Sequence, residues 1–183
     1  MNGNSELAVP QNTLGAELRQ LENKQWEQIT LPHTPFVEPL TVLHQWQGIC
    51  YYKKKITITP EEAKKHIWIE FEGAMHLADV WINGKHVMQH AGGYTPFVVD
   101  ATGLLKTGKE NELLVRLDNR NNSLIPPGKP LETLDFCYYG GIYRNVHLIA
   151  KADVHITHPI LDGHPAGAGI FITYPKVSQE LSV

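Results

Sequence analysis

Asp135 and the aromatic residues that follow it are the side chains in this sequence best suited to bind a ligand. The run 135–139 reads D-F-C-Y-Y. An ionised carboxylate can accept hydrogen bonds from two sugar hydroxyls at once, and an aromatic ring offers a flat apolar surface to the C–H face of a pyranose. Asp135, Tyr138 and Tyr139 are therefore the candidate substrate-binding residues. From the local residues alone, an aspartate that caps a turn before a strand is the favoured interpretation, and ligand binding stays open beside it.

The residues support a metal site or a catalytic nucleophile less well than they support a ligand-binding site. His86 and His90 share one face of an expected strand, but residues four apart lie about 13 Å apart along an extended chain, too far for one ion. His155 and His158 are expected on opposite faces of a later strand. The serines, at 5, 123, 178 and 182, lie in loops or tails without the elbow sequence of a nucleophile. We expect no metal, no cofactor and no catalytic residue within this chain.

The composition is that of an ordinary folded protein. Of the 183 residues, 42% are hydrophobic and 19% are charged, which argues against disorder. The net charge of -3 offers no cationic surface to nucleic acid, and no stretch approaches the ~20 apolar residues of a membrane-spanning helix. Residues 1–10 lack the pattern of an export signal, although a trimmed signal would leave the same sequence. Periplasm and cytoplasm both stay open for a bacterial protein. Cys50 and Cys137 are too few for a disulfide framework and are expected to be buried thiols.

Alternation of apolar and polar residues, with turn residues every ten positions or so, predicts a β-sandwich or barrel. The expected strands are 52–59, 66–71, 78–82, 85–90, 97–100, 113–117 and 142–149. Asn83-Gly84 predicts a type I′ hairpin, because both central residues of that turn need a positive φ. Residues 102–106 are expected to form one helical turn that Gly108 ends. Asp79 and Arg144 are interpreted as structural, since a charged residue among apolar strand neighbours needs a partner.

The chain divides near residue 152. Val154–His158 and Ile170–Tyr174 have strand patterns, but two strands are too few for a sandwich domain, which needs about seven. We therefore expect one domain over 1–152 and the beginning of a second over 153–183.

Two motif blocks resemble a known family. Residues 71–97 read F-E-G-A-M-H-L-A-D-V-W-I-N-G-K-H-V-M-Q-H-A-G-G-Y-T-P-F, and residues 125–144 read I-P-P-G-K-P-L-E-T-L-D-F-C-Y-Y-G-G-I-Y-R. Together they resemble the N-terminal sugar-binding domain of family 2 glycoside hydrolases, which include β-galactosidases and β-glucuronidases. The resemblance implies an all-β fold: a jelly-roll β-sandwich of the galactose-binding-domain-like type, followed by the first strands of a truncated immunoglobulin-like sandwich.

The same resemblance implies a function. In that family an aspartate before an aromatic run and G-[IL]-[YFHQ]-R hydrogen-bonds a sugar hydroxyl, and Asp135 stands at that place. The H-x-G-G-Y-x-P-F element, here 90–97, shapes the sandwich rim, either as a rigid connection or as a sugar contact. Terminal β-glycosides, β-galactosides foremost, would be hydrolysed with retention by two glutamates on a later barrel domain. Asn111-Glu112 matches the family's acid/base dipeptide but opens a strand, E-L-L-V-R-L-D, so the chain alone is expected to be inactive.

Other functions remain compatible with these residues. A stand-alone carbohydrate-binding module would use the same sandwich without catalysis, a β-glucuronidase would share both motif blocks, and a purely structural domain would bind no sugar. The expected partner is the terminal β-linked sugar of an oligosaccharide or glycoconjugate. No nucleic acid or membrane partner is expected, and the full-length enzyme is expected to be a homo-oligomer.

Overall fold

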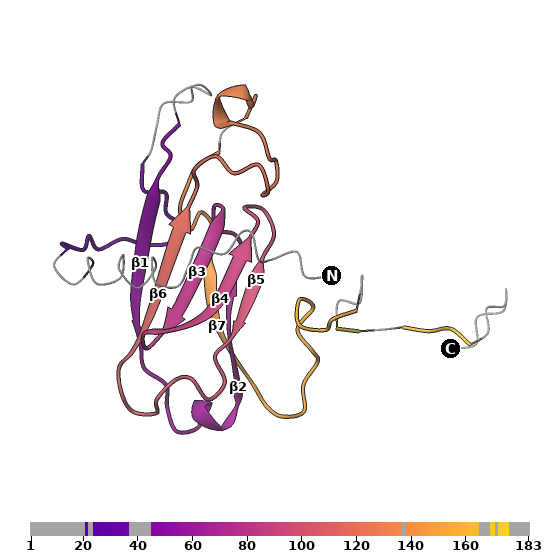
Figure 1. The fold of residues 1–183 in the computed structure, drawn as a ribbon. Coiled ribbons are helices and arrows are strands. Elements are labelled where there is room, and N and C mark those ends of the chain that lie inside the picture. Colours follow the sequence, from indigo (N-terminus) through magenta and orange to yellow (C-terminus); the bar gives the residue numbers. More distant parts are fainter. Residues whose placement is uncertain are drawn as a thin grey trace.

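The protein forms two antiparallel β-sheets that face each other (Figure 1). The computed structural model describes residues 21, 24–36, 45–136, 138–164, 169–170 and 172–175. One sheet has the order β1-β6-β3-β4 and the other the order β5-β2-β7. The strands are β1 (Ile49–Ile56), β2 (His66–Phe71), β3 (Leu77–Ile82), β4 (Lys85–Ala91), β5 (Phe97–Asp100), β6 (Asn111–Asp118) and β7 (Val146–Lys151), with short 3-10 turns η2 (Glu62–Lys64) and η3 (Leu131–Thr133). The expected all-β jelly-roll sandwich is confirmed.

Alternate residues of the strands fill the space between the sheets. In β2, Ile67, Ile69 and Phe71 are buried against the inward residues of β3 and β6. The rings of Phe71 and Phe97 stack with 4.6 Å between their centroids. A period of two places every second side chain on the same face of a sheet, so the apolar alternation in the sequence becomes one continuous core.

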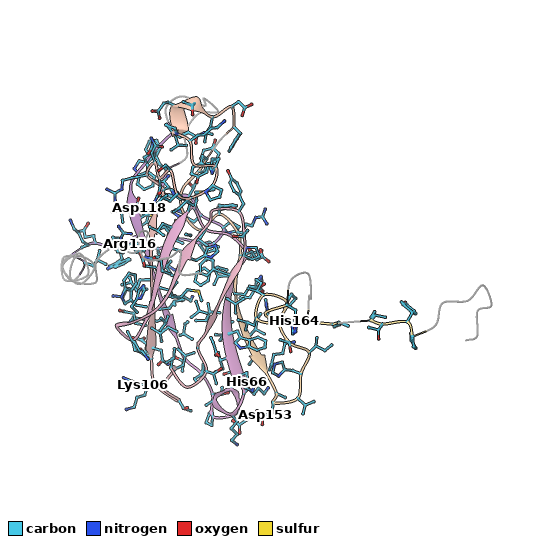
Figure 2. The ribbon with its side chains drawn as sticks, turned by 45° about the vertical axis from the view of Figure 1, so that its right-hand side comes forward. His66, Lys106, Arg116, Asp118, Asp153 and His164 are labelled. Atoms are coloured by element: carbon cyan, nitrogen blue, oxygen red, sulfur yellow. The ribbon has the colours of Figure 1, made fainter. Side chains whose placement is uncertain are left out.

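The outer face of the four-stranded sheet holds a buried group of charges. Arg116 is 1% exposed, and its guanidinium lies 3.5 Å from Asp79 Oδ2 and 3.3 Å from Asp118 Oδ2 (Figure 2). The other oxygen of Asp79 accepts a hydrogen bond from Gln89 Nε2 at 2.9 Å and lies 3.1 Å from His86 Nε2. A buried ion needs partners of this kind because water no longer solvates it. The structural interpretation of Asp79 is confirmed.

The hairpin between β3 and β4 forms as expected, with φ of 51° at Asn83 and 78° at Gly84. The register shifts after Val80, where Val80 pairs with Met88 but Trp81 pairs with His86. This β-bulge leaves one extra residue in β4 and changes the face that following side chains occupy. His86 therefore lies against Asp79 and Trp81, whereas His90 stacks on Phe97 with 4.5 Å between centroids. The prediction that the two histidines share a face was wrong.

Several expected boundaries differ in the structure. The first strand runs from 49 to 56 instead of 52 to 59. Residues 102–105 form a turn and not a helical turn, because Gly103 takes a left-handed φ of 72° in its middle. The last strand begins at Val146 and not at 142, and Gly141 before it forms an isolated bridge with Met75. Arg144 consequently lies outside a strand, exposed, with its guanidinium 5.7 Å from the centre of the Tyr143 ring.

The segment after β7 is not a strand among the residues that the structure describes. Instead of pairing through its backbone, it packs side chains on β2: the rings of His155 and His158 both contact Trp68, at 5.1 and 5.7 Å between centroids. Asp153 lies 3.6 Å from His66 Nε2 (Figure 2). The strand expected at Val154–His158 is therefore not formed, and residues 170 and 172–174 of the strand expected at Ile170–Tyr174 are not in a strand. The two histidines do not point to opposite faces, since both contact Trp68. A second domain over 153–183 stays a prediction.

Candidate functional site

Three connections meet at one end of the sandwich (Figure 1). They are residues 72–76 between β2 and β3, residues 92–96 between β4 and β5, and the long segment 119–145 between β6 and β7. A small apolar cluster of Met75, Leu131, Leu134 and Tyr138, with Tyr143 packed against it, joins them. This cluster is separate from the main core, so it serves to hold the loops together.

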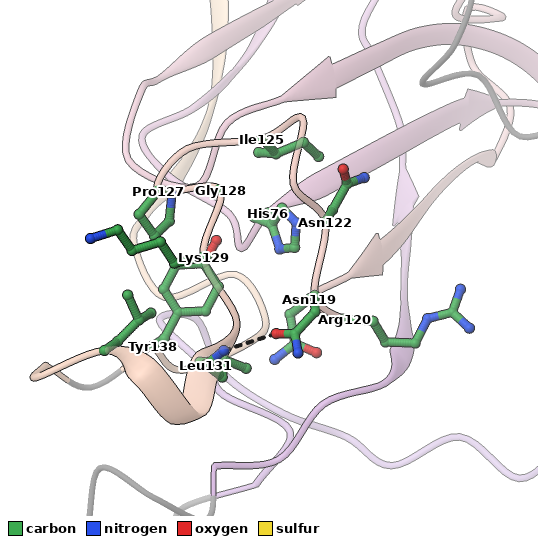
Figure 3. Close-up of a pocket in the computed structure, with 12 residues that line it drawn as sticks. His76, Asn119, Arg120, Asn122, Ile125, Pro127, Gly128, Lys129, Leu131 and Tyr138 are labelled. Carbon is green, nitrogen blue, oxygen red and sulfur yellow. Dashed lines mark hydrogen bonds between the residues drawn. The ribbon is translucent and has the colours of Figure 1, made fainter.

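The long segment is fixed by side-chain amides to residues 45–48, which directly precede β1. Asn119 is 1% exposed; its Oδ1 accepts a hydrogen bond from the Gly48 backbone N–H at 2.8 Å, and its Nδ2 donates to the Trp46 carbonyl at 2.8 Å. Asn121 Oδ1 accepts from the Leu131 N–H at 2.9 Å (Figure 3), and Gln45 Oε1 accepts from the Tyr138 N–H. These hydrogen bonds give a long loop a defined shape, although the buried Gln45 Nε2 has no hydrogen-bond partner among the described residues.

The glycine pair 140–141 explains why this segment passes so close to its neighbours. A Cβ at Gly140 would lie 2.8 Å from Asn119 Nδ2. Gly141 has a φ of 94°, and a Cβ there would lie 2.5 Å from the Tyr52 hydroxyl and 2.7 Å from the His33 carbonyl oxygen. Only glycine fits both the backbone conformation and the space. Gly140 and Gly141 therefore let the segment pack closely against its neighbours, which positions the residues that precede them.

The structure places the three candidate residues differently. Asp135 is exposed and follows directly on Leu134 of the apolar cluster, so its carboxylate is presented to solvent from a fixed support. Tyr138 is 4% exposed, and its ring lies 5.6 Å from that of His76, centroid to centroid. Burial raises the pKa of Tyr138 well above its usual range. Tyr139 is half-buried. Tyr138 is therefore a packing residue, and its ring does not offer a face to a sugar in this structure.

A small pocket is lined mainly by residues of the 119–145 segment (Figure 3). Among the described residues, His76 is the one lining residue from outside that segment, and Ile125, Leu134 and Tyr138 are among the others. His76 is 3% exposed, and its Nδ1 has no hydrogen-bond partner among the described residues. Burial lowers the pKa of His76 to about 4, which keeps the imidazole neutral at physiological pH. Its backbone carbonyl accepts a hydrogen bond from the Gly92 N–H at 2.9 Å, so His76 connects the pocket to the β4–β5 loop.

The β4–β5 loop, part of the 90–97 element that was expected to be a rigid connection or a sugar contact, presents one exposed aromatic residue, which the sequence did not single out. A Cβ at Gly93 would lie 2.2 Å from Met75 Sδ, so this glycine lets the loop rest directly on the apolar cluster. The Tyr143 hydroxyl donates a hydrogen bond to the Gly93 carbonyl. Tyr94, the next residue, is 47% exposed, and its ring lies 6.1 Å from that of Tyr138, centroid to centroid. The signal that could have found it is a large aromatic directly after two glycines.

The described part of the chain contains neither a cluster of metal-binding side chains nor a membrane-spanning helix. No group of three or more His, Cys, Asp or Glu side chains lies close enough there to hold a metal ion. Within the same ranges, no helix is long and apolar enough to cross a membrane. Glu112 lies in β6, where it forms an ion pair with Lys53 at 2.9 Å, so Asn111-Glu112 opens a strand of the sandwich as expected. Cys50 is a free thiol, while Cys137 lies outside the described residues.

The model of the sugar binding domain of glycosyl hydrolases family 2 matches residues 5–152. This chain belongs to that family. A sandwich whose loops fix an exposed aspartate at one end is consistent with that membership.

Relatives fall into two groups by activity. The chain is 34% identical over 153 residues to a β-galactosidase from Thermoanaerobacter pseudethanolicus, covering 82% of this chain and 20% of the relative. It is also 34% identical over 158 residues to a β-glucuronidase from Bacteroides fragilis, covering 83% and 21%. The chain thus spans about a fifth of the length of these curated relatives.

Solved structures show the same division. A Bacteroides uniformis β-glucuronidase superposes with a TM-score of 0.63 at 34% identity, over 70% of this chain and 15% of that one. A structure described as a putative β-galactosidase from Bacteroides fragilis gives 0.64 at 32% identity, over 73% and 20%.

Proposed function

We propose that this chain is the sugar-binding domain of a longer retaining glycoside hydrolase that cleaves terminal β-glycosides, with β-galactosides as the preferred substrate. The observation that carries the proposal is the exposed carboxylate of Asp135, held at the end of the sandwich by the apolar cluster and by the amide contacts of the 119–145 segment. Membership of the family supports a carbohydrate as the ligand.

The domain contributes binding and not bond cleavage. An ionised aspartate accepts hydrogen bonds from the hydroxyls of a terminal sugar, and such bonds are stronger than those between neutral groups. Binding energy gained far from the scissile bond holds the sugar in its reactive position, which lowers the barrier only when the groups that break the bond are present. We therefore expect the isolated chain to bind galactose with at most millimolar affinity and to hydrolyse no chromogenic β-galactoside.

A β-glucuronide is the second candidate substrate. A β-glucuronidase relative is as similar to this chain, at 34% identity, as the β-galactosidase relative is. The chemistry of Asp135 argues for a neutral sugar first. A glucuronate carries its own carboxylate, which the Asp135 carboxylate repels unless a cation lies between them. A homo-oligomeric full-length enzyme remains part of the proposal and rests on the resemblance alone.

Nuclear magnetic resonance titration of the chain with galactose and with glucuronic acid tests this function. The proposal expects saturable shifts of amides in 131–145 with galactose, and weaker binding of glucuronic acid. Binding of neither sugar up to about 100 mM, some hundredfold above a millimolar dissociation constant, would leave only the purely structural domain.

A further inference from the structure

Tyr94 combines exposure with a rigid support at the end of the sandwich where Asp135 lies. Its ring is 47% exposed, although aromatic side chains of this size are usually largely buried. The residue before it, Gly93, rests on Met75, and the Tyr143 hydroxyl holds the Gly93 carbonyl. The next residue, Thr95, has its Oγ1 3.2 Å from His90 Nε2. The backbone on both sides of the exposed ring is therefore fixed.

Tyr94 and Asp135 are attached to the same apolar cluster. Met75 and Tyr138 belong to that cluster, and they contact the β4–β5 loop through Gly93 and through the Tyr94 ring. Leu134 also belongs to it and directly precedes Asp135. The two exposed side chains therefore extend from one support, although 41 residues apart in numbering.

The contact with Tyr138 leaves a face of the Tyr94 ring available. The two rings meet edge to face, with 71° between their planes. In such an arrangement one ring contributes its edge and the other a single face, so at least one face of Tyr94 is outside the contact. A flat apolar ring face and a carboxylate that extend from the same apolar cluster match the two kinds of surface of a pyranose, its C–H face and its hydroxyls.

We propose that Tyr94 is a second sugar-contacting residue, whose ring stacks on the C–H face of the pyranose that Asp135 holds by its hydroxyls. The inference rests on the proposed function, because it needs Asp135 to bind a sugar. It transfers to Tyr94 the stacking role that the sequence suggested for Tyr138, which the structure shows to be buried. Because the ring and not the hydroxyl makes the contact, phenylalanine should replace tyrosine at this position.

Galactose titrations of four variants test the inference. Tyr94→Leu keeps apolar bulk against the cluster but loses the flat ring, and we expect galactose to bind it about 5- to 10-fold more weakly, the loss of one stacking contact. Tyr94→Phe should bind as the wild type does. Tyr174→Leu is the matched control, since Tyr174 is 75% exposed and lies far along the chain from this loop. Asp135→Asn reports on the proposed function independently.

Each outcome decides between the two claims. Weaker binding by Tyr94→Leu, with Tyr94→Phe and Tyr174→Leu unchanged and amide spectra that show all variants folded, supports the stacking role. Unchanged binding by Tyr94→Leu while Asp135→Asn loses affinity overturns the inference and leaves the proposed function standing. Equal losses in Tyr94→Leu and Tyr94→Phe also overturn it, because the hydroxyl and not the ring would then matter. Absence of galactose binding by the wild type overturns both.

Discussion

The ring of Tyr94 meets the ring of Tyr138 edge to face, with 6.1 Å between their centroids. Through this contact the β4–β5 loop packs against the segment that carries Asp135. Tyr94 faces solvent while Tyr138, which it contacts, is buried. Asp135 likewise is exposed while Leu134, the residue before it, is buried. The candidate site is therefore built from rigid parts before any ligand arrives, which reduces the entropy lost on binding.

The glycine at 141 is expected to be essential to the fold of this segment. Gly141→Ala would force a Cβ to within 2.5 Å of the Tyr52 hydroxyl at a φ of 94°, and should lower the free energy of unfolding by about 2–4 kcal/mol. Gly84→Ala is the control: its φ of 78° is also left-handed, but nothing lies within 4 Å, so only about 1 kcal/mol of backbone strain is expected. Urea unfolding measures both. Equal losses in the two variants would show that the close packing at 141 contributes nothing.

Arg116 should be far more important to stability than its neighbour Arg120. Arg116→Ala leaves the carboxylates of Asp79 and Asp118 without their buried guanidinium and should cost about 3–5 kcal/mol. Arg120 pairs with the same Asp118, but its side chain is 58% exposed, so Arg120→Ala should cost no more than about 1 kcal/mol. Thermal unfolding of the two variants at neutral pH makes the comparison. A larger loss for Arg120→Ala would contradict the assigned burial.

His76 should make stability depend on pH. Its pKa is lowered from 6.5 to about 4 in the folded state, so the unfolded chain binds the proton more tightly. Stability is therefore complete above pH 6.5 and falls as the pH is lowered toward 4, by roughly 3 kcal/mol at most. His76→Gln lacks this titration and should show a shallower decline over the same window. Parallel unfolding curves for the wild type and His76→Gln between pH 6.5 and 4 would be incompatible with a neutral, buried His76.

The Cys50 thiol should resist chemical modification in the folded protein. Burial raises its pKa to about 12, so almost no thiolate is present at pH 8. In a Cys137→Ser variant, which leaves Cys50 as the single thiol, a disulfide reagent should react at least about a hundredfold faster after denaturation than before. Rapid labelling of the native variant would show that Cys50 is accessible.

The sequence anticipated features that depend on local pattern. The alternation at 66–71 and 97–100 marked β2 and β5 correctly, and Asn83-Gly84 marked the hairpin. The motif around Asp135 led to the family that the comparison with known proteins established.

Features set by distant contacts were missed for physical reasons. The bulge in β4 is an irregularity of pairing, so the sequence of one strand does not reveal that His86 and His90 face opposite ways. Tyr138 is buried because residues from three connections close over it, and Tyr94 is exposed because Gly93 can approach Met75. The segment after β7 has a strand pattern, but residues 152–164 pair with no strand, and their side chains pack on Trp68 instead.

The central claim, that Asp135 binds a sugar, is tested most directly by calorimetric or resonance titration of galactose into the wild type, Asp135→Asn and Glu132→Gln. Glu132 is the matched control, an exposed acid in η3 three residues away. Loss of a charged acceptor predicts that Asp135→Asn binds galactose at least about tenfold more weakly, the effect of a hydrogen bond to a charged group, while Glu132→Gln binds as the wild type does. Equal affinity in Asp135→Asn and the wild type would contradict the account.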